Sequence, residues 1–375
     1  MELELDNDQH LFWETSRKFI ESSCPLATVR QLYDDPDGFD RGWWRQVAEL
    51  GWTSMLVPEE HGGGTVSGNG LLDLVLVAEE MGRWVSPGPF LPTNVVAATV
   101  ARSGSAEQKK DLLGAVVAGE LTAAWCFDEP GTRWGPAGVG LTARGDGGDF
   151  VLAGIKSPVE AAAQADRLLV TARTGEGLGQ FLVPADAPGV RVTPLRSLDF
   201  CRRFATVSFE DVRVPESAVV GAPGGAAGDV EIQIQLAAAL QCAETVGAVD
   251  RVFEFTTQYA FDRFSFGRPL ASYQALKHRF ADMKTWLEAC HATATSAARG
   301  VQEGADDAGD LASVAKSYVG ERSVDIIQDC VQMHGGIGVT WEHDIHLYLR
   351  RATVNRETYG TPADHRERLA SLLGM

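Results

Sequence analysis

The sequence predicts an α+β protein of several domains: an N-terminal helical domain, a central antiparallel β-barrel or β-sandwich, and a C-terminal four-helix bundle. A length of 375 residues suits about two or three domains. Apolar residues recur at helical spacing towards both ends of the chain, whereas the middle has short β-rich runs between Gly, Pro and Asp turns. We place the domains at residues 1–118, 119–226 and 227–375.

The N-terminal domain shows four helical segments with different apolar patterns. We expect helices over residues 8–20, 39–50, 71–81 and 105–118. The third is apolar on nearly all sides, which is typical of a buried helix. Ser105 and Gln108 form a capping-box pattern that opens the fourth. Residues 57–64 contain a proline and three successive glycines, so we expect a loop there.

The middle and the C-terminal part differ in period. The expected strands cover residues 121–127, 150–153, 168–171, 180–183, 190–193 and 206–209. After the glycine-rich segment 221–228 the helical period returns. The expected helices of the bundle cover residues 229–260, 270–300, 309–333 and 343–357. Strands at such short intervals are typical of an antiparallel barrel or sandwich.

The charge balance excludes two kinds of partner. The chain has 33 Lys and Arg against 51 Asp and Glu, which gives a net charge of −18. Phosphate backbones and anionic lipids bind clustered Lys and Arg, so we expect neither nucleic acid nor membrane as a partner. The acidic N-terminus lacks the features of a signal peptide, and no apolar run approaches the ~20 residues that span a bilayer.

Six scattered cysteines without a C-x-x-C pair predict a cytoplasmic chain with reduced thiols and no metal site. Several common catalytic motifs are missing as well. The sequence has no P-loop, no G-x-G-x-x-G after a strand, no H-E-x-x-H and no G-x-S-x-G. Hydrolase and nucleotide-kinase functions are therefore disfavoured.

Two segments of the bundle carry more specific patterns. Residues 259–283 combine Arg263, Phe266 and a Gly-Arg-Pro turn, and residues 332–342 contain a histidine followed by two glycines. A fixed guanidinium beside an aromatic ring suits a flat or phosphorylated ligand. A double glycine at a helix end lets backbone amides approach a pyrophosphate. Taken alone, each glycine is equally well explained as a simple helix stop.

In this order, after a β domain, the two segments resemble the acyl-CoA dehydrogenase family, and the resemblance extends over the whole chain. It implies the three-domain fold of that family, FAD as cofactor, and α,β-dehydrogenation of an acyl-CoA thioester, with an electron-transfer protein as acceptor. In the family, the bundle of one subunit contacts the ADP half of a flavin that its neighbour mainly holds. The matching positions are Arg263, Phe266, Gln274, Gln332, Gly335 and Gly336.

The catalytic carboxylate of the family is missing at both positions where members carry it. In many members it is the Glu of a Y-E-G-T motif, and the matching residue is Tyr359, whose ordinary pKa of about 10 makes it a poor base. In other members the Glu lies at the position of Ala237. Glu244, two turns further along that helix face, is the nearest acid, and Glu357 is a weaker candidate. Glu244 is also well explained as an ordinary polar helix residue.

The segments that face the flavin ring in the family are altered. Members commonly have T-E-P-x-A-G-S-D, whereas residues 127–134 are F-D-E-P-G-T-R-W, so that Asp128 replaces the Thr. Downstream, the usual K-x-x-I-[ST]-x-A is represented by K-S-P-V-E-A-A at residues 156–162. The contacts that serve a neighbour are thus intact, while the ring-side contacts of this chain are eroded.

Three functions are compatible with the resemblance. The first is a subunit that completes the flavin pocket of a heteromeric acyl-CoA dehydrogenase whose partner carries the catalytic Glu. The second is a self-sufficient homotetramer that uses Glu244 or another acid as base. The third is a flavoprotein of the same fold that acts on a carrier-protein thioester. The first function predicts weak FAD retention by the chain alone and strong retention with the partner.

Overall fold

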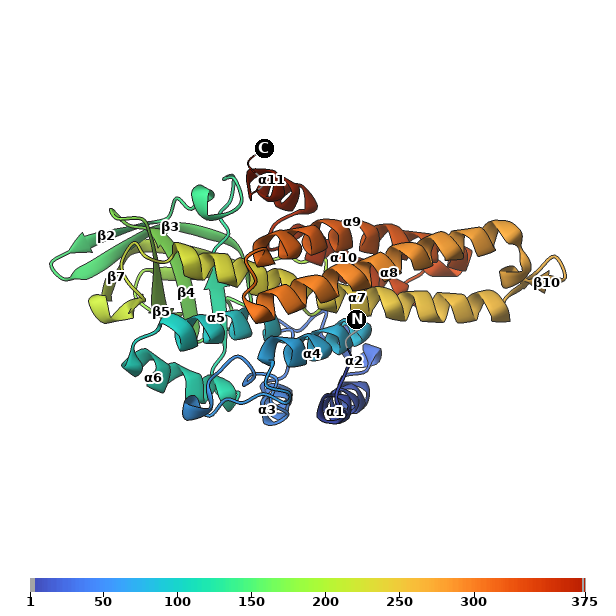
Figure 1. Ribbon diagram of the computed structural model, residues 1–375, viewed down its shortest axis with the longest axis horizontal. Helices are drawn as coiled ribbons and strands as arrows, with labels where there is room; N and C mark the ends of the chain where they lie inside the picture. The colour runs from blue at the N-terminus through green and yellow to red at the C-terminus, as the bar shows by residue number, and fades with distance from the viewer. Residues whose placement is uncertain (1–3, 373, 375) are drawn as a thin grey trace.

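The computed structural model describes residues 4–372 and 374, and it follows the predicted order of helices, sheet and helical bundle (Figure 1). The N-terminal helices are α1 Asn7–Ser23, α2 Leu26–Gln31, α3 Arg41–Glu49, α4 Gly70–Trp84, α5 Phe90–Ser103 and α6 Ala106–Val117. The sequence did not predict α2 or α5. The first is only six residues long, and the second is buried on most sides and so lacks an amphipathic pattern.

Side-chain caps fix the starts of three of these helices. Asp6 and Gln9 form a capping box at α1, and Asp40 accepts a hydrogen bond from the amide of Trp43 at α3. The predicted capping box is present at α6. Each cap satisfies amides that the helix itself leaves unpaired and contributes about 1 kcal/mol.

The middle of the chain forms one eight-stranded sheet. Its strands are β1 Ala123–Cys126, β2 Thr142–Asp146, β3 Asp149–Glu160, β4 Arg167–Arg173, β5 Leu178–Pro184, β6 Val190–Leu195, β7 Phe204–Pro215 and β8 Val219–Val220. The order is β6-β7-β3-β2-β4-β5-β8, with β1 beside β4. Most neighbours are antiparallel, as predicted. The pairs of β4 with β1 and β2 are parallel, because the chain crosses over between them.

The predicted four-helix bundle is confirmed. Its helices are α7 Ala227–Asp262, α8 Gln274–Glu303, α9 Ala308–His334 and α10 Ile345–Glu357, and α11 Pro362–Leu372 follows them. Helix α7 packs against the other three, and α9 packs against α8 and α10. A hairpin of β9 Phe264–Ser265 and β10 Arg268–Pro269 closes the far end of the bundle, at the right of Figure 1. The expected domain limit at residue 118 falls directly after α6, and the one at residue 226 falls directly before α7; both limits stay predictions.

Helix α4 crosses α7 at two glycines. A Cβ on Gly82 would lie 1.8 Å from the carbonyl oxygen of Glu244, and one on Gly247 would lie 1.9 Å from the carbonyl oxygen of Glu79. Only glycine permits so close an approach of two backbones. The crossing fixes the N-terminal helices on the bundle at the level of Glu244.

Two further features concern the chain as a whole. Within residues 4–372, no helix combines the length and the apolar character that crossing a bilayer requires. All six cysteines are buried and unpaired, in line with the prediction of reduced thiols in the core.

Candidate active site

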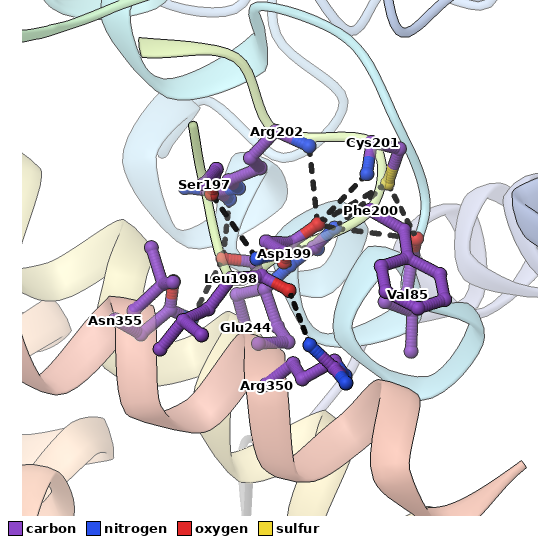
Figure 2. Close-up of polar contacts among 12 residues, drawn as sticks. Val85, Ser197, Leu198, Asp199, Phe200, Cys201, Arg202, Glu244, Arg350 and Asn355 are labelled. Atoms are coloured by element: carbon purple, nitrogen blue, oxygen red, sulfur yellow. Dashed lines mark hydrogen bonds and ion pairs between the residues drawn. The ribbon is translucent and has the colours of Figure 1, made fainter. Parts of the chain in front are cut away.

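Glu244 is almost fully buried, and both of its carboxylate oxygens are engaged. Oε1 accepts a hydrogen bond from Nη1 of Arg351 at 2.6 Å, and Oε2 accepts one from Nη2 of Arg202 at 2.5 Å. The side-chain amide of Asn355 donates to the same Oε2 at 3.1 Å. Figure 2 shows Glu244 between the loop that carries Arg202 and the helix that carries Asn355. Its surroundings are those of a buried ion pair.

Glu244 belongs to a buried charge cluster that consists of Glu160, Asp199, Arg202, Glu244 and Arg351. Arg351 binds Asp199 through Nε and donates to the carbonyl of Ser86. Arg202 also binds Glu160 at 3.1 Å. Burial opposes the ionisation of Asp199, but Arg351 and Arg202 outweigh it and lower its pKa to about 2. The buried charge cluster therefore ties the N-terminal helices, the sheet and the bundle together.

Tyr359, at the usual Glu position of the family, is buried beside this cluster. Its hydroxyl donates to Oε2 of Glu160 at 2.8 Å, and its ring stacks on Trp125 with a centroid distance of 5.8 Å. Burial and the neighbouring Glu160 raise the pKa of Tyr359 well above its ordinary value. The residue is thus a neutral phenol and a hydrogen-bond donor.

The ring-side segments form their own buried pair. Nζ of Lys156 donates to Glu129 at 2.7 Å and to the carbonyl of Phe127 at 2.9 Å. Glu129 also accepts hydrogen bonds from the amides of Gly140 and Leu141, each at 2.9 Å. The Glu-Pro that this chain shares with the family therefore stabilises a turn between β1 and β2.

Asp128 stands out because part of its carboxylate is unsatisfied. Oδ1 is buried and has no hydrogen-bond partner among the described residues. Burial raises the pKa of Asp128 to about 6. The residue borders a cavity of about 140 Å³ beside Gly360. Sequence analysis noted it as a replacement for Thr but assigned it no role.

The six residues predicted to contact the flavin lie at one end of the bundle. Arg263, Phe266 and Gln274 come from the end of α7, the hairpin and the start of α8; Gln332, Gly335 and Gly336 come from the end of α9. The hydroxyl of Tyr259 donates to the carbonyl of His334 at 3.4 Å, and the two rings lie 4.3 Å apart. This contact holds the two predicted segments together. We call these six residues the bundle tip.

Phe266 is the most unusual residue of the bundle tip. Its side chain is 97% exposed, and its backbone adopts a positive φ of 50°. A non-glycine residue in this conformation costs of order 1–3 kcal/mol. Phe266 and Gly267, with φ of 50° and 80°, are the two central residues of the hairpin, and a two-residue turn of this kind requires a positive φ at both, so the backbone conformation belongs to the turn and presents the Phe266 ring to solvent.

The models of the three domains of the acyl-CoA dehydrogenase family match successive segments of this chain. Residues 6–120 match the N-terminal domain, residues 124–212 the middle domain and residues 230–373 the C-terminal domain. The chain belongs to the acyl-CoA dehydrogenase family. The predicted fold, the cofactor FAD and the class of reaction, oxidation of a CH–CH bond in an acyl-CoA, are confirmed at the level of the family.

Individual relatives agree over almost the full length. Acyl-CoA dehydrogenase IpdE2 of Mycolicibacterium smegmatis is 28% identical over 97% of this chain and 98% of its own. A variant of the Tcur3481–Tcur3483 steroid ACAD is 29% identical with a TM-score of 0.88, over 98% of this chain and 97% of that chain. The ChsE4–ChsE5 complex from Mycobacterium tuberculosis is 27% identical with a TM-score of 0.88, over 100% of this chain and 99% of that chain.

The two halves of the expected flavin contact differ in how well they fit FAD. At the bundle tip, a Cβ on Gly335 or Gly336 would meet no atom within 4 Å, so the turn is open to a ligand. Arg263 is exposed and forms no ion pair with any described residue. On the ring side, Asp128 and Trp134 border the cavity of about 140 Å³ at positions where the family's motif has hydroxyl side chains. The tip fits an ADP group, and the ring side does not fit an isoalloxazine ring.

Proposed function

We propose that this chain completes the flavin pocket of a heteromeric acyl-CoA dehydrogenase whose other subunit supplies the catalytic Glu. The observation that carries the proposal is the state of Tyr359 and Glu244, since the weaker candidate Glu357 pairs with Arg356 at 3.4 Å. Tyr359 is a buried phenol bound to Glu160, and Glu244 is enclosed by two guanidiniums. Tyr359 carries no carboxylate, and both carboxylate oxygens of Glu244 are held by guanidiniums.

Removal of a thioester α-proton needs a carboxylate that reaches the substrate and accepts the proton. Glu244 would have to leave Arg202 and Arg351, and breaking a buried pair costs about 3–5 kcal/mol. Protonation of Glu244 would weaken the same interactions. These energies support a structural role for Glu244 and a base on the partner subunit.

The contribution of this chain would come from its bundle tip. When bound, FAD accepts the β-hydride of the substrate. Arg263 would neutralise charge on the pyrophosphate, and Phe266 would cover the adenosine end. The open turn at residues 335–336 would offer backbone amides, and the exposed Gln274 and Gln332 would add hydrogen bonds. The ring of the same flavin would lie in the partner subunit.

Two relatives support a heteromer. The Tcur3481–Tcur3483 protein and the ChsE4–ChsE5 complex each combine two differently named chains. We therefore propose a second acyl-CoA dehydrogenase-type chain as partner, an acyl-CoA as substrate and an electron-transfer protein as acceptor. A cytoplasmic location belongs to the proposal as well, because six free thiols suit a reducing compartment.

The test removes one carboxylate at a time from the assembly. The chain is co-expressed with acyl-CoA dehydrogenase-type chains encoded beside it, and the pair that co-purifies is assayed with acyl-CoA and a dye acceptor. Replacing the Glu of the partner's Y-E-G-T motif by Gln should lower turnover by several orders of magnitude. Glu244→Gln, in an assembly that remains folded, should retain most of it. A chain that is active alone and loses this activity with Glu244→Gln would instead be a self-sufficient enzyme.

A further inference from the structure

The two altered ring-side segments meet around the small cavity beside Asp128. Phe127 and Trp134 from the first segment and Pro158 from the second border it, together with Gly360 next to Tyr359. The family resemblance puts the flavin ring beside these same segments. The cavity is therefore what remains of this chain's own ring site.

Trp134 is part of an aromatic array that fills this region. The rings of Tyr359, Trp125, Phe127, Trp134 and His365 follow one another with centroid distances of 5.8, 5.0, 6.3 and 4.8 Å. The indole of Trp134 lies so close to Gly360 that a Cβ there would be 2.8 Å from Cζ2. Five aromatic rings thus occupy the space between the sheet and the end of the bundle.

A second cavity, of about 310 Å³, adjoins the first and also has Trp134 in its lining. Arg133, Trp134, Gly135 and Asp364 border both cavities, so Trp134 lies where the two cavities meet. Counted from the shared Glu-Pro at 129–130, Trp134 takes the position of the Ser in the family's T-E-P-x-A-G-S-D. Because protein interiors are close-packed, an indole in place of a hydroxymethyl group removes room for a ligand.

The remaining space is also acidic. Glu357 and Asp364 border it in addition to Asp128. Of the nearby cations, Lys156 binds Glu129 and Arg133 binds Glu367, while Lys316 donates to the carbonyl of Asn355. A reduced flavin is anionic at its N1–C2 carbonyl edge and needs positive charge or hydrogen-bond donors there. The acidic lining of the cavity therefore opposes a flavin ring, in addition to the small size of the cavity.

We infer that Trp134 closes this chain's own flavin-ring site, so that the chain contacts a flavin held by its partner and holds no ring itself. The closure is a property of this chain alone. The stoichiometry that follows from it, one flavin for each pair of chains, rests on the proposed function.

Riboflavin tests the closure directly, because it carries the ring but lacks the ADP group that the bundle tip would bind. Wild-type protein should leave riboflavin fluorescence unchanged. Trp134→Ser restores the side chain usual in the family and frees the volume of the indole where the two cavities meet. This variant should bind riboflavin about tenfold more tightly than the wild type, or tighter still, as measured by fluorescence quenching. Trp84→Ser, at the end of α4, is the matched control and should behave like the wild type.

Circular dichroism and thermal denaturation establish that each variant is folded, and Trp134→Thr replaces Trp134→Ser if the latter is not. Wild-type protein that binds riboflavin as tightly as the variants overturns the inference. Folded Trp134 variants that gain no affinity overturn it too. The proposed function fails in a different experiment, when no heteromer forms, because the riboflavin titration needs no partner.

Discussion

The hydroxyl of Tyr359 donates a 2.8 Å hydrogen bond to the carboxylate of Glu160. Counted along the family's motifs, Tyr359 stands where many members carry Glu, and Glu160 stands where they carry Ser or Thr. A carboxylate and a hydroxyl have thus exchanged places across the ring site. The carboxylate of Glu160 is bound by both Tyr359 and Arg202, and it therefore has a structural role.

Tyr359→Phe should reduce stability and spare turnover. The variant keeps the ring on Trp125 but removes one of the donors of buried Glu160, which costs about 1–3 kcal/mol. Urea denaturation of the chain measures this loss. The assembly with its partner should keep its turnover, whereas a large loss of turnover at unchanged stability would place Tyr359 in the chemistry.

Glu244→Gln should cost about 3–5 kcal/mol of folding free energy, because Arg202 and Arg351 would lose their shared carboxylate. Glu321→Gln is a suitable control, since Glu321 forms an exposed pair with Arg366 worth about 0.2–1 kcal/mol. Both values come from urea denaturation under the same conditions. Equal stability of the two variants would contradict the importance of the buried charge cluster.

Arg263→Ala should weaken FAD binding by the assembly about 10- to 100-fold, the equivalent of one charge-assisted hydrogen bond. Arg299→Ala, an exposed arginine near the other end of α8, controls for the loss of one positive charge. Flavin retained after dialysis against a series of FAD concentrations gives both affinities. Equal retention by the two variants would remove Arg263 from the flavin site.

Stability should fall as the pH is lowered from about 6.5 towards 4. Burial and the neighbouring His343 lower the pKa of His334 to about 4, and burial with Lys316 lowers that of His365 to about 3. The unfolded chain, with an ordinary pKa of about 6.5, binds these protons first, so protonation favours unfolding. Melting temperatures across this range should decline less steeply for His365→Asn. An unchanged slope would show that His365 does not titrate in this window.

Much of the fold follows from local patterns. Helical spacing and caps such as Ser105 with Gln108 mark most helices, and the motifs around Arg263 and Gly335 lie in short continuous stretches. Helix α5 was not predicted because it is buried on most sides and so lacks the alternation of apolar and polar faces by which a helix is recognised in a sequence.

The buried charge cluster could not be predicted in the same way. Its members are far apart along the chain: Arg202 lies 42 residues and Arg351 lies 107 residues from Glu244. Nothing in the sequence near Arg351 distinguishes a buried guanidinium from one on the helix surface. The proposed role of Trp134 could have been predicted from the sequence, however, because an indole is unusual in a glycine- and proline-rich turn.

The visible absorption spectrum of the purified chain, with flavin counted per chain, tests the central claim most directly. The account predicts an almost colourless protein that acyl-CoA does not bleach, and a yellow assembly with about one flavin per two chains once the partner is co-expressed. If the chain purified alone carries one flavin per chain and acyl-CoA bleaches this flavin, the result would contradict the account.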